Sequence, residues 1–379
     1  MKYRKIRAII SGGGTGGHIF PALSIAAKLK EMNPETEILF VGADGRMEME
    51  KVPAAGYRIV GLPVAGLMRK LTLSNLALPF KVIKSISMAK RLIREFKPDI
   101  AIGVGGYASA PLLWAAGRMG IPTLIQEQNG FAGLTNKILG KKAKSICVAY
   151  EGMERFFPAE RIVLSGNPIR KEIVPATAEM KSEAMEFYGL NPEKKQILIV
   201  GGSLGSGTLN NAMKKWIQDG CPGGEGIEVL WQCGKYYRKS VDEFMETAKA
   251  AGMGGDTLNH IHHSDFIQRM DLAYAAADIV ITRSGASSIS ELCVAGKACI
   301  FVPSPNVTED HQTHNAMALV NKDAGMIVKD SEAVENLMKT ACGLIGDIEK
   351  IAMMEKNIVK FAKRDAAMTI VDEVYKILG

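Results

Sequence analysis

A glycine-rich stretch near the N-terminus, Ser11-Gly-Gly-Gly-Thr-Gly-Gly-His-Ile-Phe-Pro21, constrains the fold of this chain more than any other feature. It follows an apolar run that predicts a strand over 6–10, and it precedes a helical pattern over 19–30. This combination favours phosphate binding, because glycines let the backbone approach an anion and the first amides of a helix point toward it. Gly12-x-Gly14-x-x-Gly17 also fits the dinucleotide fingerprint, which by itself is a weak match.

The same arrangement occurs a second time. The apolar run Gln196-Ile-Leu-Ile-Val200 is followed by Gly201-Gly-Ser-Leu-Gly205 and another helical pattern. Further strand-like runs alternate with helical patterns, at 37–41, 100–104, 123–125, 145–148, 229–232, 279–281 and 299–302. Such alternation predicts βαβ units and parallel sheets. Since 379 residues exceed one ordinary core, we expect two doubly wound α/β domains that face a cleft, with ligands at the carboxyl ends of the strands.

Composition narrows the class of protein. The chain is 47% apolar and 23% charged, as in globular α/β proteins, and no apolar run approaches the roughly 20 residues that span a bilayer. The basic N-terminus is not followed by the apolar core of a signal peptide. The six cysteines form no C-x-x-C pair. We therefore expect a cytoplasmic protein with reduced thiols.

Positive charge is concentrated in one stretch. From Lys51 to Arg94 there are nine Lys and Arg residues and no acidic residue, so the net charge of +7 leaves 7 − 9, about −2, for the rest of the chain. Apolar side chains are set among the cations over 66–94. This pattern predicts a surface for anionic lipid. Nucleic acid is disfavoured, because no aromatic stacking residues interleave with the cations.

Several polar residues follow predicted strands or open predicted helices. His18 can titrate near neutrality and lies where a phosphate or sugar hydroxyl would arrive. Glu291, which falls one or two turns into a helix predicted after a small-residue turn, could accept the two hydroxyls of a ribose. Glu127-Gln-Asn129 and Asp310-His-Gln312 could read sugar hydroxyls or cap their loops, and Arg170 could clamp a phosphate.

A metal site is not expected. The trio His260-x-His262-His263 lacks carboxylate or thiol partners at ligand spacing, and no Asp-x-Asp occurs in the chain. A diphosphate bridged by a metal ion, as in many sugar transferases, is therefore disfavoured, and no cofactor is predicted.

Seven motifs together resemble glycosyltransferase family 28, which has the GT-B fold. They occur in one order along nearly the whole chain: Gly13-Gly-Thr-Gly-Gly-His18, Gly105-Gly-Tyr-Ala-Ser109, Glu127-Gln-Asn129, Gly166-Asn-Pro-Ile-Arg170, Gly201-Gly-Ser-Leu-Gly205, Arg283-Ser-Gly-Ala286 with Glu291, and Asp310-His-Gln-Thr-His-Asn315. The resemblance implies transfer of N-acetylglucosamine from UDP-GlcNAc to the lipid-linked muramyl-pentapeptide precursor of peptidoglycan. It implies a peripheral enzyme at the cytoplasmic face of the cell membrane, and it leaves cell-wall or division proteins open as partners.

The resemblance also implies a division of labour between two Rossmann-like domains. Residues 1–168 with a C-terminal helix at about 360–379 would bind the acceptor and the membrane, and residues 169–359 would bind UDP-GlcNAc. The residues implied for substrate binding are Thr15, Gly16, Gly17, Asn129, Arg170, Ser203, Ile267, Ala286, Ser287, Ser288, Ile289, Ser290, Glu291 and Gln312. Beside Gln312, where the family has a second amide, this chain has His311.

The implied reaction is an inverting, metal-independent transfer in which the muramyl 4-hydroxyl attacks C1 of the sugar. His18 is the candidate base, and its rival role is a hydrogen bond to the diphosphate of the acceptor. Arg170, Ser203 and helix N-termini would stabilise the departing UDP. The alternatives are a UDP-GlcNAc 2-epimerase, an NAD(P)-dependent oxidoreductase that uses the first glycine loop, and a non-catalytic lipid-binding protein.

Overall fold

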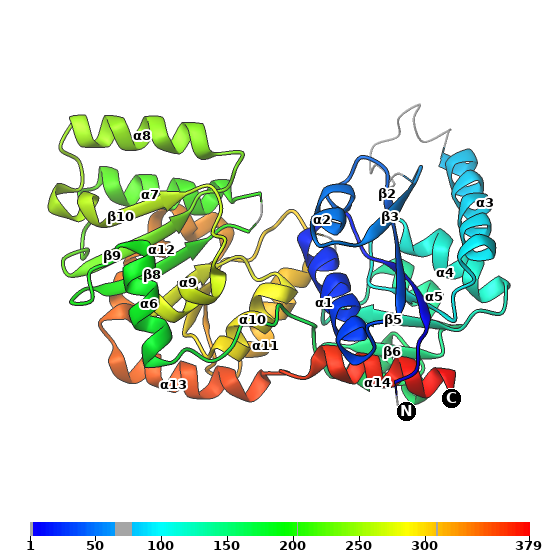
Figure 1. Cartoon of the computed structure of the whole chain (residues 1–379). Helices are drawn as coiled ribbons and strands as arrows, with labels where there is room; N and C mark the ends of the chain where they lie inside the picture. The colour runs from blue at the N-terminus through cyan, green and yellow to red at the C-terminus, as the bar shows by residue number, and fades with distance from the viewer. Residues whose placement is uncertain (1–2, 65–77, 203, 308–309) are drawn as a thin grey trace. The chain divides into compact units, whose positions relative to one another are not determined.

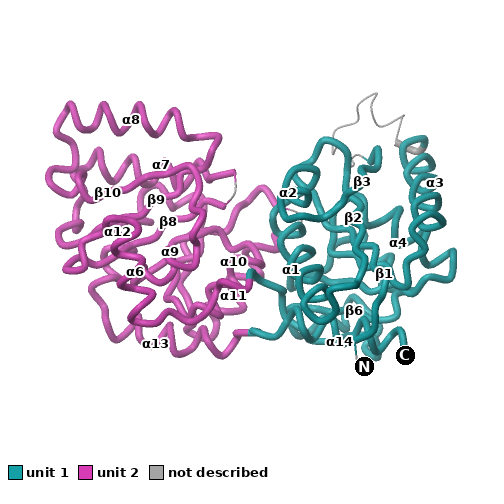
Figure 2. The backbone as a smooth tube through the Cα atoms, viewed as in Figure 1, with its two compact units in different colours: residues 1–170, 363–379 teal, residues 171–362 magenta. Residues whose placement is uncertain are grey.

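The computed structural model describes residues 3–64, 78–202, 204–307 and 310–379. The chain forms two compact units (Figure 2). Unit 1 comprises residues 1–170 and 363–379, and unit 2 comprises residues 171–362. The chain therefore leaves unit 1 after Arg170 and returns to it at Lys363 for its last segment.

Unit 1 is built on a sheet of seven parallel strands in the order β3-β2-β1-β4-β5-β6-β7. Figure 1 labels β2, β3, β5 and β6 of this sheet. The strands are β1 (Arg7–Ser11), β2 (Glu37–Ala43), β3 (Arg58–Leu62), β4 (Ile100–Gly103), β5 (Thr123–Glu127), β6 (Ser145–Val148) and β7 (Ile162–Leu164). In the register, Ala8 of β1 pairs with Ile38 of β2 and Ile100 of β4. Every residue of β4, β5 and β6 is buried, which fits the apolar run of β4 and leaves the polar residues Gln126 and Glu127 buried at the end of β5.

Helices cover both faces of this sheet. They are α1 (Gly16–Met32), α2 (Glu48–Ala54), α3 (Leu78–Phe96), α4 (Ser109–Arg118), α5 (Leu134–Gly140) and α14 (Ala366–Leu378). Successive side chains of a strand point to opposite faces. Ile9 accordingly packs in the core that contains α3 and α4, whereas Ala8 and Ile10 pack in the core that contains α1 and α14. The last helix of the chain thus completes the core that the first helix begins.

Unit 2 repeats this plan with six parallel strands in the order β10-β9-β8-β11-β12-β13. The strands are β8 (Lys195–Val200), β9 (Ile227–Gln232), β10 (Ile261–Ser264), β11 (Ile279–Thr282), β12 (Cys299–Phe301) and β13 (Met326–Ile327). The helices are α6 (Ala178–Tyr188), α7 (Gly207–Gln218), α8 (Arg238–Ala250), α9 (Met270–Ala276), α10 (Ala286–Ala295), α11 (His311–Val320), α12 (Asp330–Ile345) and α13 (Ile348–Ile358). The prediction of two doubly wound α/β domains is confirmed.

The C-terminal region differs from the sequence prediction. The sequence suggests one long helix over 351–378 that enters unit 1 at about 360, but the structure has two helices, α13 and α14. A single 3₁₀ turn, Val359–Phe361, and the extended Ala362 separate them. The charged segment that interrupts the apolar pattern is therefore a helix end, and Lys363 packs directly over Gly166 on its return to unit 1. No helix in the described ranges is long and apolar enough to cross a membrane.

Candidate active site

The strand order reverses once in each sheet, and the glycine-rich loops follow the strands at those points. In unit 1 the reversal lies between β1 and β4, so the loops at 12–15 and 104–108 are neighbours. In unit 2 it lies between β8 and β11, where the loops at 201–206 and 283–285 follow. In open α/β sheets, ligands bind beyond the carboxyl ends of the strands at such a switch point. Each unit therefore offers one candidate ligand site.

The two loops of unit 1 touch at their glycines. Gly105 and Gly106 have φ of +102° and +90°, a region that favours glycine. A Cβ on Gly106 would lie 2.5 Å from the carbonyl oxygen of Gly13. Glycine at both positions thus allows the second loop to pack against the first.

His18 lies within the first turn of α1, because that helix begins at Gly16, three residues earlier than the sequence pattern indicates. Thr15 is the N-cap residue, in extended conformation. The His18 Nδ1 atom lies 3.0 Å from the carbonyl oxygen of Gly13 and 3.4 Å from Oγ1 of Thr15. A Cβ on Gly105 would lie 2.6 Å from His18 Cδ2, so the imidazole ring packs on the second loop. Thr15, Gly16, Gly17 and His18 thus form one cluster at the helix N-terminus.

A buried carboxylate that the sequence prediction missed supports this loop. Glu48, the first residue of α2, is 1% exposed. Its Oε2 accepts a hydrogen bond from the Gly14 amide at 2.8 Å, and its Oε1 accepts one from the Ala43 amide at 3.0 Å. The Gly14 amide is therefore bonded to the protein itself.

Glu127 at the end of β5 organises the loop that carries Asn129. It is 2% exposed and accepts hydrogen bonds from the Asn129 amide at 3.1 Å and from Asn136 Nδ2 at 2.8 Å. The Gly133 amide donates to Oε2, the oxygen atom that Asn136 also contacts, at 3.2 Å. Of the two roles that the sequence left open for this motif, loop capping is the one that Glu127 performs. Asn129 is half-buried in the loop that Glu127 shapes.

Arg170 is the last residue of unit 1 before the chain enters unit 2. It is half-buried, and its guanidinium carbon lies 5.9 Å from the centroid of the Phe20 ring in α1. Ser24 of α1 donates a hydrogen bond to the carbonyl oxygen of Ile169 at 3.0 Å. Helix α1 thus positions both His18 at its start and Arg170 along its side.

The second glycine-rich loop is supported by neutral groups. Gly205 has φ of +81°, and a Cβ there would overlap the carbonyl oxygen of Cys233. Gln232 Nε2 donates to the Gly202 carbonyl at 3.2 Å, and Ser206 caps α7 by accepting from the Leu209 amide at 3.3 Å. Ser203, predicted to bind a phosphate, lies outside the described residues.

Ala286 to Glu291 form the first part of helix α10, so Glu291 lies in the second turn of this helix, within the one or two turns that the sequence predicted. The N-cap is Gly285. The first turn has no charged side chain and consists of Ala286, Ser287, Ser288 and Ile289. Because the dipole of the helix favours an anion at this end, a diphosphate would meet helix amides here. Ile289 is buried and Ser290 Oγ donates to the Ala286 carbonyl at 2.9 Å, so these two contribute mainly backbone.

Glu291 is not the solvated helix residue that its position in the sequence would suggest. It is 7% exposed, and Oε2 accepts a hydrogen bond from the hydroxyl of Tyr274 in α9 at 3.1 Å. The hydroxyls of Ser284 and Ser287, near the same helix end, are buried without a hydrogen-bond partner in the described part of the chain. Buried hydroxyls normally have partners. These orphaned groups mark the start of α10 as a place where a polar ligand is expected.

Gln312 follows strand β12, and Ile267 follows strand β10 at the edge of the same sheet. Gln312 lies in the first turn of α11, and its Oε1 accepts from the Ser304 amide at 2.9 Å. Its neighbour His311 is half-buried. Asn315, one turn later, donates to the carbonyl of Ser284 at 3.5 Å, which ties α11 to the loop before α10. Ile267 follows β10 with its side chain 4% exposed, so a ligand would meet its backbone.

The histidine trio pairs with carboxylates. His262 Nε2 lies 2.9 Å from Glu228 Oε1, and His263 Nε2 lies 2.7 Å from Asp242 Oδ1. The Arg238 guanidinium beside Asp242 lowers the pKa of that carboxyl below its usual value. Within the described ranges, no group of three or more His, Cys, Asp or Glu side chains could hold a metal ion.

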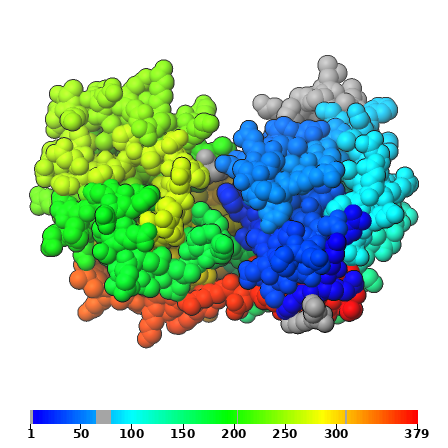
Figure 3. All heavy atoms as spheres, in the orientation of Figure 1, coloured from blue at the N-terminus to red at the C-terminus, as the bar shows by residue number. Residues whose placement is uncertain are grey.

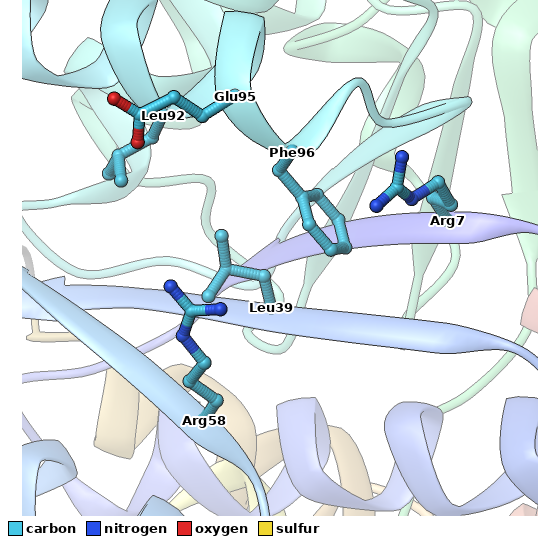
Figure 4. A pocket seen from close by; sticks show the side chains of 6 residues that line it. All are labelled: Arg7, Leu39, Arg58, Leu92, Glu95 and Phe96. Atoms are coloured by element: carbon cyan, nitrogen blue, oxygen red, sulfur yellow. The ribbon is translucent and has the colours of Figure 1, made fainter.

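Two pockets in the described structure lie away from the glycine loops. One, of about 140 Å³, lies between strands of unit 1 and the end of α3 (Figure 4), and the other, of about 530 Å³, lies beside α8 in unit 2. The first is lined by Arg7, Leu39, Arg58, Leu92, Glu95 and Phe96. The second is lined by Arg238, Asp242, Met245, Glu246, Lys249, Leu258, Asn259 and His263. Neither lining includes a residue that the sequence predicts for substrate binding.

Comparisons with known proteins agree over nearly the whole chain. A transferase of Parabacteroides distasonis, named as a UDP-N-acetylglucosamine--N-acetylmuramyl-(pentapeptide) pyrophosphoryl-undecaprenol N-acetylglucosamine transferase, is 53% identical over 99% of both chains. A transferase of the same name from Cytophaga hutchinsonii is 52% identical over 98% of this chain and 97% of its own length.

Solved structures support the same fold. Acinetobacter baumannii MurG matches with a TM-score of 0.75 and 27% identity, over 98% of this chain and 100% of its own. The UDP-GlcNAc 2-epimerase of Neisseria meningitidis matches with a TM-score of 0.68 and 13% identity, over 98% of this chain and 100% of its own. This likeness shows a shared fold alone. The glycosyltransferase family 28 N-terminal domain matches residues 8–148, and the C-terminal domain of that family matches residues 196–370. The chain therefore belongs to glycosyltransferase family 28 and has its GT-B architecture of two Rossmann-like domains.

Proposed function

We propose that this chain transfers N-acetylglucosamine from UDP-GlcNAc to the 4-hydroxyl of undecaprenyl-pyrophosphoryl-MurNAc-pentapeptide, with inversion at C1 of the sugar. The observation that carries the proposal is the identity above 50%, over nearly full length, to transferases named for this acceptor. The geometry supports it, because each unit has a glycine loop and a helix N-terminus at its switch point. A transferase of this kind needs one such site for a nucleotide diphosphate and one for a lipid diphosphate.

The donor belongs to unit 2 in this proposal. Glu291 is a buried carboxylate whose Oε2 is already held by the Tyr274 hydroxyl, so its orientation is fixed before a ligand arrives. A carboxylate has several acceptor positions and can take both hydroxyls of a ribose in addition. The diphosphate then lies at the amides that open α10, with Ser287 and Ser288 beside it, while Ile267 offers backbone atoms to the uracil. Gln312 reads the sugar.

The acceptor belongs to unit 1. Thr15, Gly16 and Gly17 open α1 and offer amides to the acceptor diphosphate. His18 takes the proton of the muramyl 4-hydroxyl as that oxygen attacks C1, and the bond from C1 to UDP breaks with its electron pair on the diphosphate. Arg170 and the helix amides stabilise that charge. Asn129, held by the Glu127 loop, contributes to recognition of the transferred sugar.

We place the lipid-binding surface on α3, which lies in the cyan part of the chain in Figure 3. Its first half exposes apolar side chains, with Phe80 77% and Ile83 65% exposed, next to the exposed cations Lys81 and Lys84. Trp114 of α4 is also exposed. Apolar side chains among cations suit an anionic membrane surface. The remainder of the predicted patch, 66–77, lies outside the described residues. Peripheral attachment at the cytoplasmic face of the membrane follows from this placement, and cell-wall or division proteins stay open as partners.

One experiment tests the reaction. Radiolabelled UDP-GlcNAc is incubated with a short-chain muramyl-pyrophosphoryl lipid in the presence of a chelator, and label in the lipid product is measured. The expected result is transfer that requires both substrates. A parallel incubation with UDP-GlcNAc alone tests the rival enzyme of the same fold, because formation of UDP-ManNAc without acceptor would identify an epimerase and overturn the proposal.

A further inference from the structure

A buried carboxylate without an assigned role lies directly behind the first glycine loop. Glu48 bridges two strand ends, since one of its oxygen atoms accepts from Ala43 at the end of β2 and the other from Gly14 in the loop after β1. A buried ionised carboxyl is costly unless it is hydrogen-bonded. Hydrogen bonds to a charged acceptor are also about twice as strong as neutral ones. The Glu48 carboxylate therefore fixes the Gly14 amide firmly.

The surrounding glycines leave room for this side chain. A Cβ on Gly13 would overlap the Glu48 carboxylate, and a Cβ on Gly42 would lie 2.6 Å from Glu48 Cγ. Two of the glycines near the site are thus explained by the carboxylate behind them. The glycines of the loop were expected to allow close approach of a ligand, but at Gly13 the group that approaches closely is the Glu48 carboxylate.

The same loop carries the contact that orients His18. The Gly13 carbonyl oxygen lies 3.0 Å from His18 Nδ1, and the Gly13–Gly14 peptide group that contains this oxygen also contains the amide nitrogen bonded to Glu48. A carbonyl oxygen can only accept, so Nδ1 must carry the proton of the neutral imidazole. Nε2 is then the basic nitrogen. One peptide group therefore connects the carboxylate on its amide side to the imidazole on its carbonyl side.

We propose that Glu48 is a positioning residue for the transfer reaction, which holds the Gly13–Gly14 peptide so that neutral His18 keeps its proton on Nδ1 and presents Nε2 as the base. The effect on the reaction rests on the proposed function of His18. The effect on the tautomer does not, because it follows from the contacts of the loop alone.

The test uses the full chain labelled with ¹⁵N-histidine, at about pH 8.5, where an ordinary imidazole is neutral. Long-range ¹H–¹⁵N correlation spectra distinguish protonated from unprotonated ring nitrogens, and the spectrum of His18→Ala identifies the His18 signals. Glu48→Gln retains the size of the side chain but can accept from only one of the two amides through its single oxygen. Glu50→Gln is the matched control, because Glu50 lies in the same first turn of α2 and is exposed.

We expect the wild type and Glu50→Gln to show His18 protonated on Nδ1, and Glu48→Gln to show a mixture of tautomers. In Glu48→Gln, kcat should also fall about 100-fold, because a misplacement of about 1 Å at a catalytic group can have an effect of this size. KM for UDP-GlcNAc should stay unchanged. If Glu48→Gln fails to fold, Gly42→Ala displaces the same side chain without removing its charge and should shift the tautomer likewise.

Two results would overturn the inference: a proton on Nε2 of His18 in the wild type, or an unchanged His18 spectrum and kcat in a folded Glu48→Gln or Gly42→Ala variant. If instead the wild type showed no transfer at all while its tautomer responded to Glu48→Gln, the positioning effect would stand and the proposed function would fail.

Discussion

The two glycine-rich loops share a sequence pattern, yet different groups support them. Behind the loop of unit 1 lies the charged carboxylate of Glu48, and the following helix carries His18 in its first turn. Behind the loop of unit 2 lie the neutral groups Gln232 and Cys233, and Ser206 caps its helix. The pattern of strand, glycines and helix therefore specifies where a ligand can bind, whereas the groups that support the two loops differ in charge: a carboxylate in unit 1 and neutral groups in unit 2.

The largest effect should come from removing the imidazole of unit 1. We expect His18→Ala to lower kcat by about 10² to 10⁴-fold, the usual contribution of general base catalysis, with little change in KM for the acceptor. Steady-state kinetics with both substrates varied will check this. A rise in the acceptor KM at unchanged kcat would remove the distinction between the two loops, because His18 would then be a binding group for the acceptor diphosphate.

A change in unit 2 should act on the donor instead. Glu291→Ala removes a charged acceptor for the ribose hydroxyls, and hydrogen bonds to charged groups contribute about 1.5 to 3 kcal/mol each. We expect KM for UDP-GlcNAc to rise about 100-fold with the acceptor KM unchanged. Tyr274→Phe deletes only the hydroxyl that orients Glu291, so its effect should be smaller and in the same direction. Equal effects on both substrates would show that the units do not divide the substrates between them.

Alanine at matched glycines tests whether each loop depends on its close contacts. Gly106→Ala in unit 1 and Gly205→Ala in unit 2 each place a Cβ against backbone atoms at positive φ. We expect each to lower Tm by several degrees, since about 1 kcal/mol shifts Tm by about 2–4 °C in domains of 150–250 residues. Gly106→Ala should lower kcat, and Gly205→Ala should raise KM for UDP-GlcNAc.

Gly117→Ala serves as the control for these variants. It lies in α4, where an added Cβ meets nothing within 4 Å, so it should keep Tm and activity or raise Tm slightly. If Gly117→Ala lowered Tm as much as the loop variants do, close packing at Gly106 and Gly205 would not explain the lower Tm of those variants.

The smallest effect concerns the lipid surface. We expect Phe80→Ser with Ile83→Ser to weaken binding to vesicles that contain anionic lipid by about tenfold, because each side chain loses part of the roughly 1.5–3 kcal/mol that full burial would contribute. Sedimentation with vesicles measures this, and transfer to a short-chain acceptor in detergent should stay unchanged. Phe187→Ser is the matched control, since Phe187 is 56% exposed on α6 of unit 2. Equal losses in the two variants would argue against a surface confined to α3.

Much of the fold was predictable because its signals are local. Strand β1, the glycine loop and α1 follow one another within 32 residues, and buried parallel strands read as apolar runs. The strands that the sequence did not reveal are β3, β7, β10 and β13, and three of them have a local reason. Strands β7 and β13 are only three and two residues long, and β10 carries two histidines. The C-terminal helices were merged in the prediction because their apolar patterns nearly continue across the break.

The sequence by itself determined the class of fold, the two glycine loops and the family, since these depend on residue types in a fixed order. The tertiary structure decided which group supports each loop. Glu48 contacts Gly14 across 34 residues, and Tyr274 contacts Glu291 across 17. No local sequence pattern predicts contacts at these separations. The first contact arises because parallel strands bring distant loops to one edge of a sheet, and the second because α9 and α10 pack together. In both places a buried carboxylate needs hydrogen-bond donors. The two carboxylates meet this requirement with different donors. Glu48 accepts from backbone amides behind the loop, and Glu291 accepts from a tyrosine hydroxyl beside the expected nucleotide site.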